Sequence, residues 1–314
     1  MISFPDSFWE GETRSDFFVP APMKRAWAIQ MTMLDKTLEI AKKHNIKIWL
    51  DYGSLLGCIR HQGYIPWDDD IDACVLRDDY MKLLFILKDE LPDYCDVFSF
   101  YTDERCDQPK GFVTNRKVID IGISPEEAKL TALYYGCPYM TGIDLYPLDY
   151  APTDPQKWAQ VKGLYSACYS LAMETDRYIA SGELDEYLPQ IEQITGQRVK
   201  RDEHLRNSLW KLADSIAMMT KRSESRYILW YPDSTFRKND MRRKLSWYSS
   251  TLMKPFECME VPVPEGFDGI LSTCYSENYM TPRRANAAHD YPFYAEQERK
   301  ILLYKYLGKM KDVL

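Results

Sequence analysis

Four carboxylates crowd into five positions at the end of the stretch GSLLGCIRHQGYIPWDDDID, residues 53–72: they are Asp68, Asp69, Asp70 and Asp72. Carboxylates this close repel one another, and aspartate is a poor former of helices and strands. Asp70 and Asp72 flank one apolar residue, so on a strand both side chains point to the same face, ~7 Å apart. Two oxygen donors on one face suit Mg²⁺ or Mn²⁺, and the cation would remove the repulsion. The spacing therefore predicts a metal site, with a solvated acidic turn as the alternative.

Gly53 and Ser54 begin the same stretch, directly after an expected strand and before an expected helix. Backbone N–H groups at the start of a helix can face an anion. A phosphate-binding turn followed by a strand that carries paired carboxylates is the arrangement that phosphoryl transfer requires, because the metal neutralises the phosphate that the turn holds. This pairing favours the metal interpretation over the acidic turn.

Hydrophobic periodicity predicts the elements that position these residues. An apolar stripe predicts a helix over Arg25–His44, and a second helix is expected from Asp78, which can cap it. Alternating or short apolar runs predict strands over residues 46–52, 70–76, 96–101, 111–120 and 142–148. Pro147 is expected to end the last strand, since proline cannot donate to a sheet.

The order of these elements predicts an α+β fold, a mixed β-sheet core of nucleotidyltransferase type with a helical subdomain. Helically spaced apolar residues continue from 153 to about 230, and residues 255–282 indicate a loop and hairpin that return to the core. The expected division is an irregular lead-in, a catalytic core, a mainly helical subdomain and a C-terminal segment packed on the core: residues 1–24, 25–152, 153–245 and 246–314.

Composition narrows the class of protein. The hydrophobic fraction of 45% is enough for a folded core, and a net charge of −7 argues against general nucleic-acid binding. None of the eight cysteines forms a CxxC pair, which argues against a zinc ribbon and favours reduced thiols. The first residues lack the features of a signal peptide, and no stretch reaches the ~20 apolar residues of a membrane span. The expectation is a cytoplasmic protein with no nucleic-acid partner.

The motifs carry a resemblance to a known family. Gly53-Ser54 and Asp70-Ile71-Asp72-Ala73 resemble the signature of the nucleotidyltransferase (DNA polymerase β-like) superfamily. The longer stretch YGSLLGCIRHQGYIPWDDDID resembles, at nearly every position, the signature of the LicD family, which includes bacterial phosphocholine transferases of cell-surface glycans. GIDLYPLDY (142–150) and residues 256–282 resemble later family segments more weakly. Ser276 departs from the glycine that normally follows the tail's tyrosine, which puts the loop there in doubt.

The resemblance implies roles for single residues. Asp144 is the best match to a third carboxylate that binds metal beside Asp70 and Asp72 or acts as general base, with an aspartate that caps a turn at the strand end as the alternative. Arg60 would contact phosphate and stabilise its charge, or else pair with the acidic cluster. The remaining phosphate-contact candidates are Gly53, Ser54, His61 and Lys117. Asp149 ranks below Asp144, and the basic stretch 221–244 is either a solvated helix face or a guide for an anionic ligand.

The function that the resemblance implies is metal-dependent transfer of a substituted phosphate. The donor would be CDP-choline or a CDP-polyol, and the acceptor a hydroxyl of a cell-surface glycan (lipopolysaccharide, teichoic acid or capsule) or of its lipid-linked precursor, which would bring the chain to the inner face of the membrane. Two alternatives stay open: a nucleotidyltransferase that moves NMP from an NTP, and a non-catalytic relative that binds nucleotide or glycan.

Overall fold

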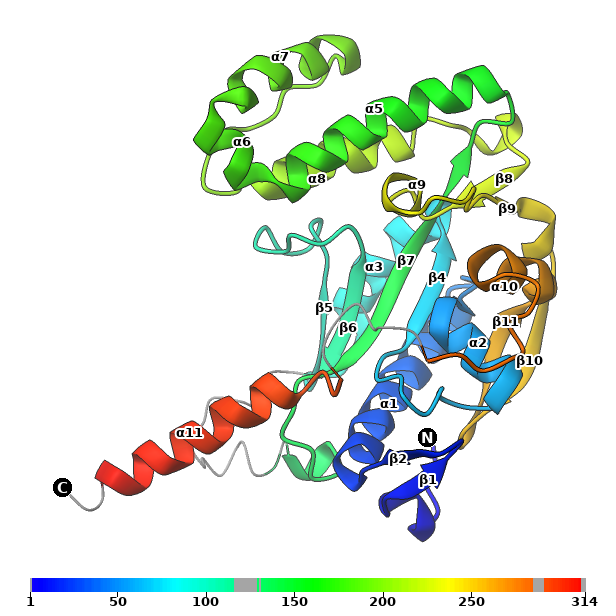
Figure 1. Ribbon diagram of the computed structural model, residues 1–314, viewed down its shortest axis with the longest axis vertical. Helices are drawn as coiled ribbons and strands as arrows, with labels where there is room; N and C mark the ends of the chain where they lie inside the picture. The colour runs from blue at the N-terminus through cyan, green and yellow to red at the C-terminus, as the bar shows by residue number, and fades with distance from the viewer. Residues whose placement is uncertain (1, 116–128, 130, 285–290, 312–314) are drawn as a thin grey trace.

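The computed structural model describes residues 2–115, 129, 131–284 and 291–311. At its centre, seven of the described strands form one mixed sheet (Figure 1). The main path runs through β3 (Trp49–Leu50), β4 (Asp72–Leu76), β7 (Gly142–Ala151), β6 (Gly111–Asn115) and β5 (Cys95–Phe98). From β7 the sheet continues through β8 (Tyr227–Leu229) to β9 (Arg243–Lys244). The pair β4–β7 is parallel and the other pairs are antiparallel, which confirms the predicted α+β class.

Helices of the core pack on this sheet. The long helix α1 (Ala21–Lys43) contacts β6, β7 and α3 (Arg77–Glu90). The short helix α2 (Tyr52–His61) contacts β4, and it also contacts α10 (Phe267–Tyr275) and the hairpin of β10 (Thr251–Phe256) and β11 (Met259–Pro264). Figure 1 shows α2, α10 and this hairpin together beside β4. Before α1, the segment expected to be irregular contains the 3-10 turn η1 (Asp6–Trp9) and the hairpin of β1 (Glu12–Arg14) and β2 (Phe17–Val19).

A group of helices lies beyond the carboxyl end of β7 (Figure 1). Its members are α5 (Pro155–Met173), α6 (Thr175–Ser181), α7 (Glu183–Thr195) and α8 (Leu205–Ala217). They bury a hydrophobic cluster of their own, with Cys168, Leu188, Leu209 and Trp210 among its members. The short elements η2 (Arg222–Glu224), α9 (Asp233–Phe236) and η3 (Leu245–Tyr248) lead back to the core. The four-part division of the chain stays a prediction.

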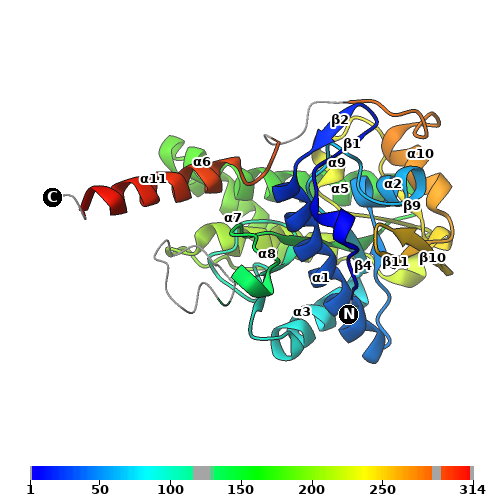
Figure 2. The same cartoon turned by 90° about the horizontal axis from the view of Figure 1, so that it is seen from below.

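The last helix, α11 (Ala295–Lys311), extends away from the rest of the molecule in both views (Figures 1 and 2). Its first turn is fastened to the loop before β7, where the Tyr139 hydroxyl donates to Glu298 Oε1 at 3.0 Å and the Met140 N–H donates to Gln297 Oε1 at 2.8 Å. No helix in the described part of the chain combines the length and the apolarity needed to cross a membrane.

Two strands differ from the sequence expectation for identifiable reasons. The strand expected over residues 46–52 is reduced to Trp49–Leu50, because Asp51 leaves the sheet to cap α2. The strand expected to end at Pro147 runs on to Ala151. Pro147 pairs with Val75 of β4, but it lies beyond Leu145, the last residue paired with β6, and before Asp149, the first paired with β8. One flank of the strand is therefore unpaired there, so a proline is tolerated.

A buried arginine joins the core to the helical group. The Arg77 guanidinium donates to both oxygens of Asp149, at 2.6 and 2.7 Å, and to both oxygens of Asp214 on α8, at 2.7 and 2.9 Å. Arg77 is 5% exposed, so its charge is stable only because two carboxylates surround it. Asp149 is thus a structural partner of Arg77.

Replacing Arg77 should be far more destabilising than replacing an exposed arginine. Arg77→Met leaves two buried carboxylates without their cation, which costs about 3–5 kcal/mol. Arg105→Met breaks the exposed pair with Asp103 and should change stability little, because water already solvates both charges. Urea unfolding of both variants measures the difference. If both variants lost the same small free energy of unfolding, the ion pairs of Arg77 with Asp149 and Asp214 would not be what joins the core to the helical group.

Candidate metal and phosphate site

Strand pairing brings three acidic residues together at the amino ends of β4 and β7. Asp72 is the first residue of β4 and the register partner of Asp144 on the parallel strand β7. The Asp144 N–H donates to the Ile71 carbonyl at 2.8 Å. Asp70 lies two residues before Asp72. One carboxylate oxygen from each of Asp70, Asp72 and Asp144 lies within 4.8 Å of the others. Three hard oxygen donors at this spacing fit a divalent cation of the Mg²⁺ or Mn²⁺ type.

The other two aspartates of the stretch differ in orientation. Asp68 and Asp69 form a second close group with Asp70. Asp69 is buried and accepts a hydrogen bond from the Phe293 N–H at 2.6 Å, while its carbonyl accepts one from Gln30 at 2.7 Å. Asp69 therefore links the acidic loop to α1 and to the segment after α10. The Asp68 carboxylate lies next to those of Asp69 and Asp70.

Burial and mutual repulsion disfavour ionisation of these carboxylates. Burial, and then the charges of Asp70 and Asp144, raise the pKa of Asp72 well above its ordinary value. Burial and the neighbouring Asp70 likewise raise the pKa of Asp68. Burial also raises the pKa of Asp144, although Lys110 opposes the change. The cluster is therefore a place where a cation lowers the free energy of the folded chain.

Lys110 is a site residue that the sequence analysis missed. Its ammonium pairs with Asp144 Oδ2 and donates to the Tyr146 hydroxyl at 3.3 Å. The Tyr146 hydroxyl in turn donates to Asp144 Oδ2 at 3.2 Å. Lys110 precedes β6, and the antiparallel register that pairs Phe112 with Asp144 brings it there. A lysine next to an expected strand was the available signal, but the register that gives it meaning could not be predicted.

The start of α2 faces the same carboxylates. The Asp51 side chain accepts from the Tyr52 N–H at 2.8 Å and so caps the helix, and Asp51 is held by the buried Arg243 at 2.6 Å. The Ser54 Oγ accepts from the Asp72 N–H at 2.9 Å and so fixes the start of β4. A Cβ at Gly53 would lie 2.5 Å from Asp68 Oδ2, so only glycine lets the helix approach the cluster this closely.

Aromatic side chains form much of the wall around the cluster. A cavity of about 370 Å³ is lined by Asp68, Asp69, Asp70 and Asp72 together with residues of α9 and its surroundings. Its rings are those of Tyr52, Trp67, Tyr146, Trp230, Phe236, Tyr275 and Tyr291. Asp233 also lines it, with Oδ2 accepting from the Tyr52 hydroxyl at 2.5 Å and Oδ1 at 3.6 Å from Arg237 Nε. The site thus combines carboxylates with an aromatic enclosure that the sequence analysis did not foresee.

Two of the predicted phosphate contacts, Arg60 and His61, do not line this cavity, and a third, Lys117, cannot be placed relative to it. Arg60, at the far end of α2, donates to the Tyr279 carbonyl at 2.7 Å, and neither it nor His61 lines the cavity. Burial, with Arg60 and Arg14 adding to it, lowers the pKa of His61 to about 4, so His61 is neutral at pH 7. Lys117 lies outside the described residues. Roles for these three in phosphate binding stay predictions.

A comparison with protein families matches the segment that contains Asp70 and Asp72. Residues 45–123 match the model of the LicD/FKTN/FKRP nucleotidyltransferase domain. The chain contains a LicD-family nucleotidyltransferase domain. The match includes Gly53, Asp70, Asp72 and Lys110, whereas Asp144 lies beyond it.

Two relatives extend the comparison. An uncharacterized protein of Rickettsia prowazekii is 45% identical over 64 residues, which are 20% of this chain and 24% of the relative. The lipopolysaccharide cholinephosphotransferase LicD of Haemophilus influenzae is 26% identical over 151 residues, 44% of this chain and 51% of the relative. The matched part of the chain thus spans about half or less of the length of these relatives.

Removing one carboxylate should stabilise the metal-free protein. Because the pKa of Asp72 is raised on folding, its ionisation costs stability as pH rises from about 4 through the folded-state pKa. In EDTA at pH 8, Asp72→Asn should therefore be more stable than the wild type, and the gain should vanish near pH 4.

Scanning calorimetry in EDTA and in Mn²⁺ measures both effects. Mn²⁺ should raise the melting temperature of the wild type and not that of Asp72→Asn, while the exposed Asp93→Asn should behave as wild type. A loss of stability in Asp72→Asn at pH 8, or the same Mn²⁺ shift in all three proteins, would contradict the electrostatic account.

A methyl group at Gly53 should weaken metal binding without unfolding the chain. The added Cβ meets the end of the Asp68 side chain and displaces a carboxylate from the cluster, so we expect the Mn²⁺ affinity of Gly53→Ala to fall about tenfold by titration calorimetry. Gly163→Ala is the matched control, because a Cβ there meets nothing within 4 Å in the helix α5 and should stabilise the protein by about 0.5–1 kcal/mol. Unchanged Mn²⁺ affinity in Gly53→Ala would remove Gly53 from the site.

Proposed function

We propose that this protein is a metal-dependent transferase of the LicD type that moves phosphocholine from CDP-choline to a hydroxyl of a cell-surface glycan or its lipid-linked precursor. The observation that carries the proposal is the combination of a carboxylate cluster and an aromatic enclosure in one cavity of a LicD-family domain. The printed name of the Haemophilus influenzae relative, a lipopolysaccharide cholinephosphotransferase, supports the same class of reaction.

The aromatic enclosure favours choline over an uncharged polyol. A quaternary ammonium carries a positive charge but no N–H donor, and the faces of Trp and Tyr rings attract it by about 0.5–2 kcal/mol. Trp230, Phe236 and Tyr275 supply such rings in the cavity. Asp233 lines the same cavity, where Arg237 Nε lies 3.6 Å from its Oδ1 and burial raises the pKa of its carboxyl. The ring faces are therefore the feature that favours a quaternary ammonium.

The carboxylates have distinct proposed roles. Asp70, Asp72 and Asp144 would hold one or two Mg²⁺ or Mn²⁺ ions, which supply positive charge and Lewis acidity at the donor's phosphates when bound. Asp144 would also accept the proton of the acceptor hydroxyl, for which its raised pKa makes it a better base than an ordinary aspartate. The Lys110 ammonium would stabilise negative charge at the phosphoryl group.

The proposed reaction balances in one displacement. The acceptor oxygen forms a bond to the phosphorus of the phosphocholine group while the bond from that phosphorus to the CMP oxygen breaks. The hydroxyl proton passes to Asp144, and CMP leaves with its phosphate. We place this reaction in the cytoplasm, where nucleotide-linked donors are made, and at the inner membrane face when the acceptor is lipid-linked.

Donor binding tests the proposal. CDP-choline, CDP-glycerol, CDP-ribitol and CTP are titrated into the wild type and into Asp144→Asn, Trp230→Leu and Trp158→Leu, with Mn²⁺ and with EDTA, and CMP and pyrophosphate are quantified. We expect CDP-choline to bind only with metal, slow CMP release from the wild type, and no CMP from Asp144→Asn. Trp230→Leu should lose about 3- to 30-fold in CDP-choline affinity and little in CDP-glycerol affinity.

Trp158 lies half-buried in the helical group and does not line the cavity, so Trp158→Leu should match the wild type. Preference for CTP with pyrophosphate release would overturn the proposal in favour of a nucleotidyltransferase. Preference for CDP-glycerol or CDP-ribitol would keep the transferase and overturn choline. Failure of every nucleotide to bind with metal would remove the carboxylate cavity as a donor site and leave a non-catalytic relative.

A further inference from the structure

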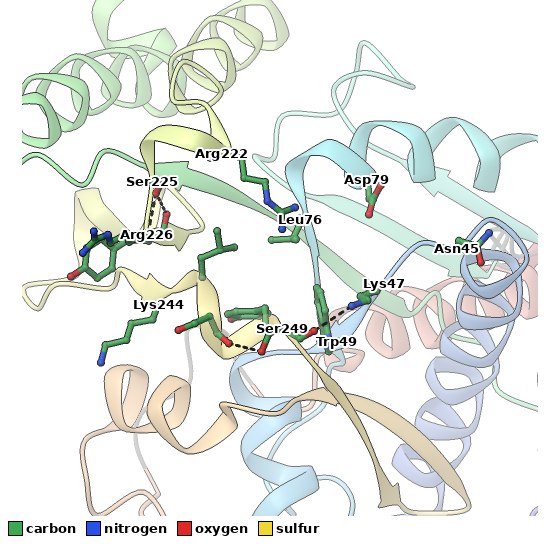
Figure 3. Close-up of a pocket in the computed structure, with 14 residues that line it drawn as sticks. Asn45, Lys47, Trp49, Leu76, Asp79, Arg222, Ser225, Arg226, Lys244 and Ser249 are labelled. Carbon is green, nitrogen blue, oxygen red and sulfur yellow. Dashed lines mark hydrogen bonds between the residues drawn. The ribbon is translucent and has the colours of Figure 1, made fainter.

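A second and larger cavity lies near the other end of β4. Its volume is about 790 Å³, and Leu76 and Trp49 form part of its lining (Figure 3). Leu76 is four residues along β4 from Asp72, a distance of about 13 Å in an extended strand. The two cavities share no lining residue. The second cavity is therefore separate from the carboxylate site.

The lining of this cavity is basic in an acidic chain. The net charge of the chain is −7, yet four cationic side chains meet here and Asp79 is the one carboxylate among the residues that line the cavity. The cations are Lys47, Arg222, Arg226 and Lys244. Within the described ranges of the chain, none of the four has a carboxylate oxygen within ion-pair distance. Lys47 Nζ donates to the Ser249 carbonyl at 3.5 Å, and Lys244 Nζ lies 5.5 Å from the centre of the Trp247 ring. These uncharged partners do not neutralise the cations.

The positive groups come from separate segments and surround the hollow. Lys47 precedes β3, Arg222 lies in η2, Arg226 precedes β8, and Lys244 ends β9. Figure 3 shows Lys47 and Lys244 on opposite sides of the cavity with Arg222 between them, near Leu76. Charge on several sides suits a ligand with more than one anionic group, since a single small anion could reach only part of the set.

The helix α3 begins at the cavity with Leu76 as its N-cap residue. Asp78 and Asp79 lie in the first turn of α3 and offset the partial positive charge of the helix start, so the positive potential of the cavity comes from the four side chains. Tyr248 forms another part of the wall, and its hydroxyl accepts from Arg243 at 3.0 Å, the arginine that holds Asp51. The cavity thus has a rigid wall that also supports the start of α2.

We propose that this cavity binds a ligand that carries at least two phosphate groups, with a diphosphate as the simplest member of the class. A hollow of about 790 Å³ with cations from separate segments suits a discrete ligand. The inference goes beyond the proposed transfer reaction and does not depend on it, because no residue of the carboxylate cavity takes part.

Titration calorimetry with sodium pyrophosphate in EDTA tests this directly. Without a metal ion, the carboxylate cavity repels a diphosphate, so the heat reports on the basic cavity. We expect saturable binding by the wild type, and about tenfold or greater loss of affinity in the triple variant Lys47→Ala/Arg222→Ala/Lys244→Ala. All three side chains are exposed, so the variant should fold.

The matched control removes the same charge elsewhere. Arg105→Ala/Lys200→Ala/Lys300→Ala also replaces three exposed cations, none of which lines the cavity, and should bind pyrophosphate as the wild type does. Asp72→Asn should also leave the affinity unchanged. Orthophosphate should bind at least tenfold more weakly than pyrophosphate.

Other outcomes overturn the inference. No saturable heat, or equal losses in the two triple variants, would mean that the cavity is an ordinary solvated surface. Equal affinity for orthophosphate and pyrophosphate would exclude a site for two phosphate groups. If the cavity variant lost binding to phosphatidylglycerol vesicles in a sedimentation assay but kept its affinity for pyrophosphate, the cations would serve a membrane contact instead.

Discussion

Repulsion among carboxylates at the amino ends of two adjacent parallel strands is the constraint on which the rest of the site depends. Asp72 and Asp144 are register partners in the middle of the sheet, and Asp70 joins them from the preceding loop. Nothing in β-sheet formation favours this arrangement, because each buried negative charge raises the cost of the next. The fold offsets part of that cost with the Lys110 ammonium. A bound dication would offset more.

Buried arginines hold the frame around this unfavourable cluster. Arg243 fixes Asp51, which caps α2 and so places Gly53 next to Asp68. Arg77 joins the strand that carries Asp144 to the helical group through Asp149 and Asp214. Each arginine is stable in the interior because its carboxylate partners are buried with it, so the supports are pairs of opposite charge around a site of like charge.

One segment contributes to both cavities. Residues 221–244 appear in the sequence as a basic stretch. In the structure, Arg222, Arg226 and Lys244 line the second cavity, whereas Trp230, Asp233 and Arg237 line the carboxylate cavity. The stretch therefore contributes cations to both cavities, and its Trp230 and Asp233 to the carboxylate cavity alone.

The parts of the site that could be predicted from the sequence are those whose residues lie close together along the chain. Asp70 and Asp72 are two residues apart, and Gly53 precedes them by one short helix and a loop. Asp144 required the family resemblance, and the parallel register then placed it beside Asp72. Lys110 and Trp230 could not be predicted, because one depends on the register of β6 and the other on where α9 returns to the core. The run of β7 through Pro147 was missed for the same reason, since only the partner strands determine which N–H groups are needed.

The most direct test of the central claim is to locate a metal ion in crystals grown with MnCl₂, by anomalous scattering. The account predicts an Mn²⁺ peak among the carboxylates of Asp70, Asp72 and Asp144, with oxygen ligands at about 2.1–2.3 Å. Crystals of Asp72→Asn prepared in the same way should lack that peak. A wild-type cluster without an ion, or an ion bound elsewhere with the cluster unchanged, would contradict the claim that these carboxylates gather to bind a cation.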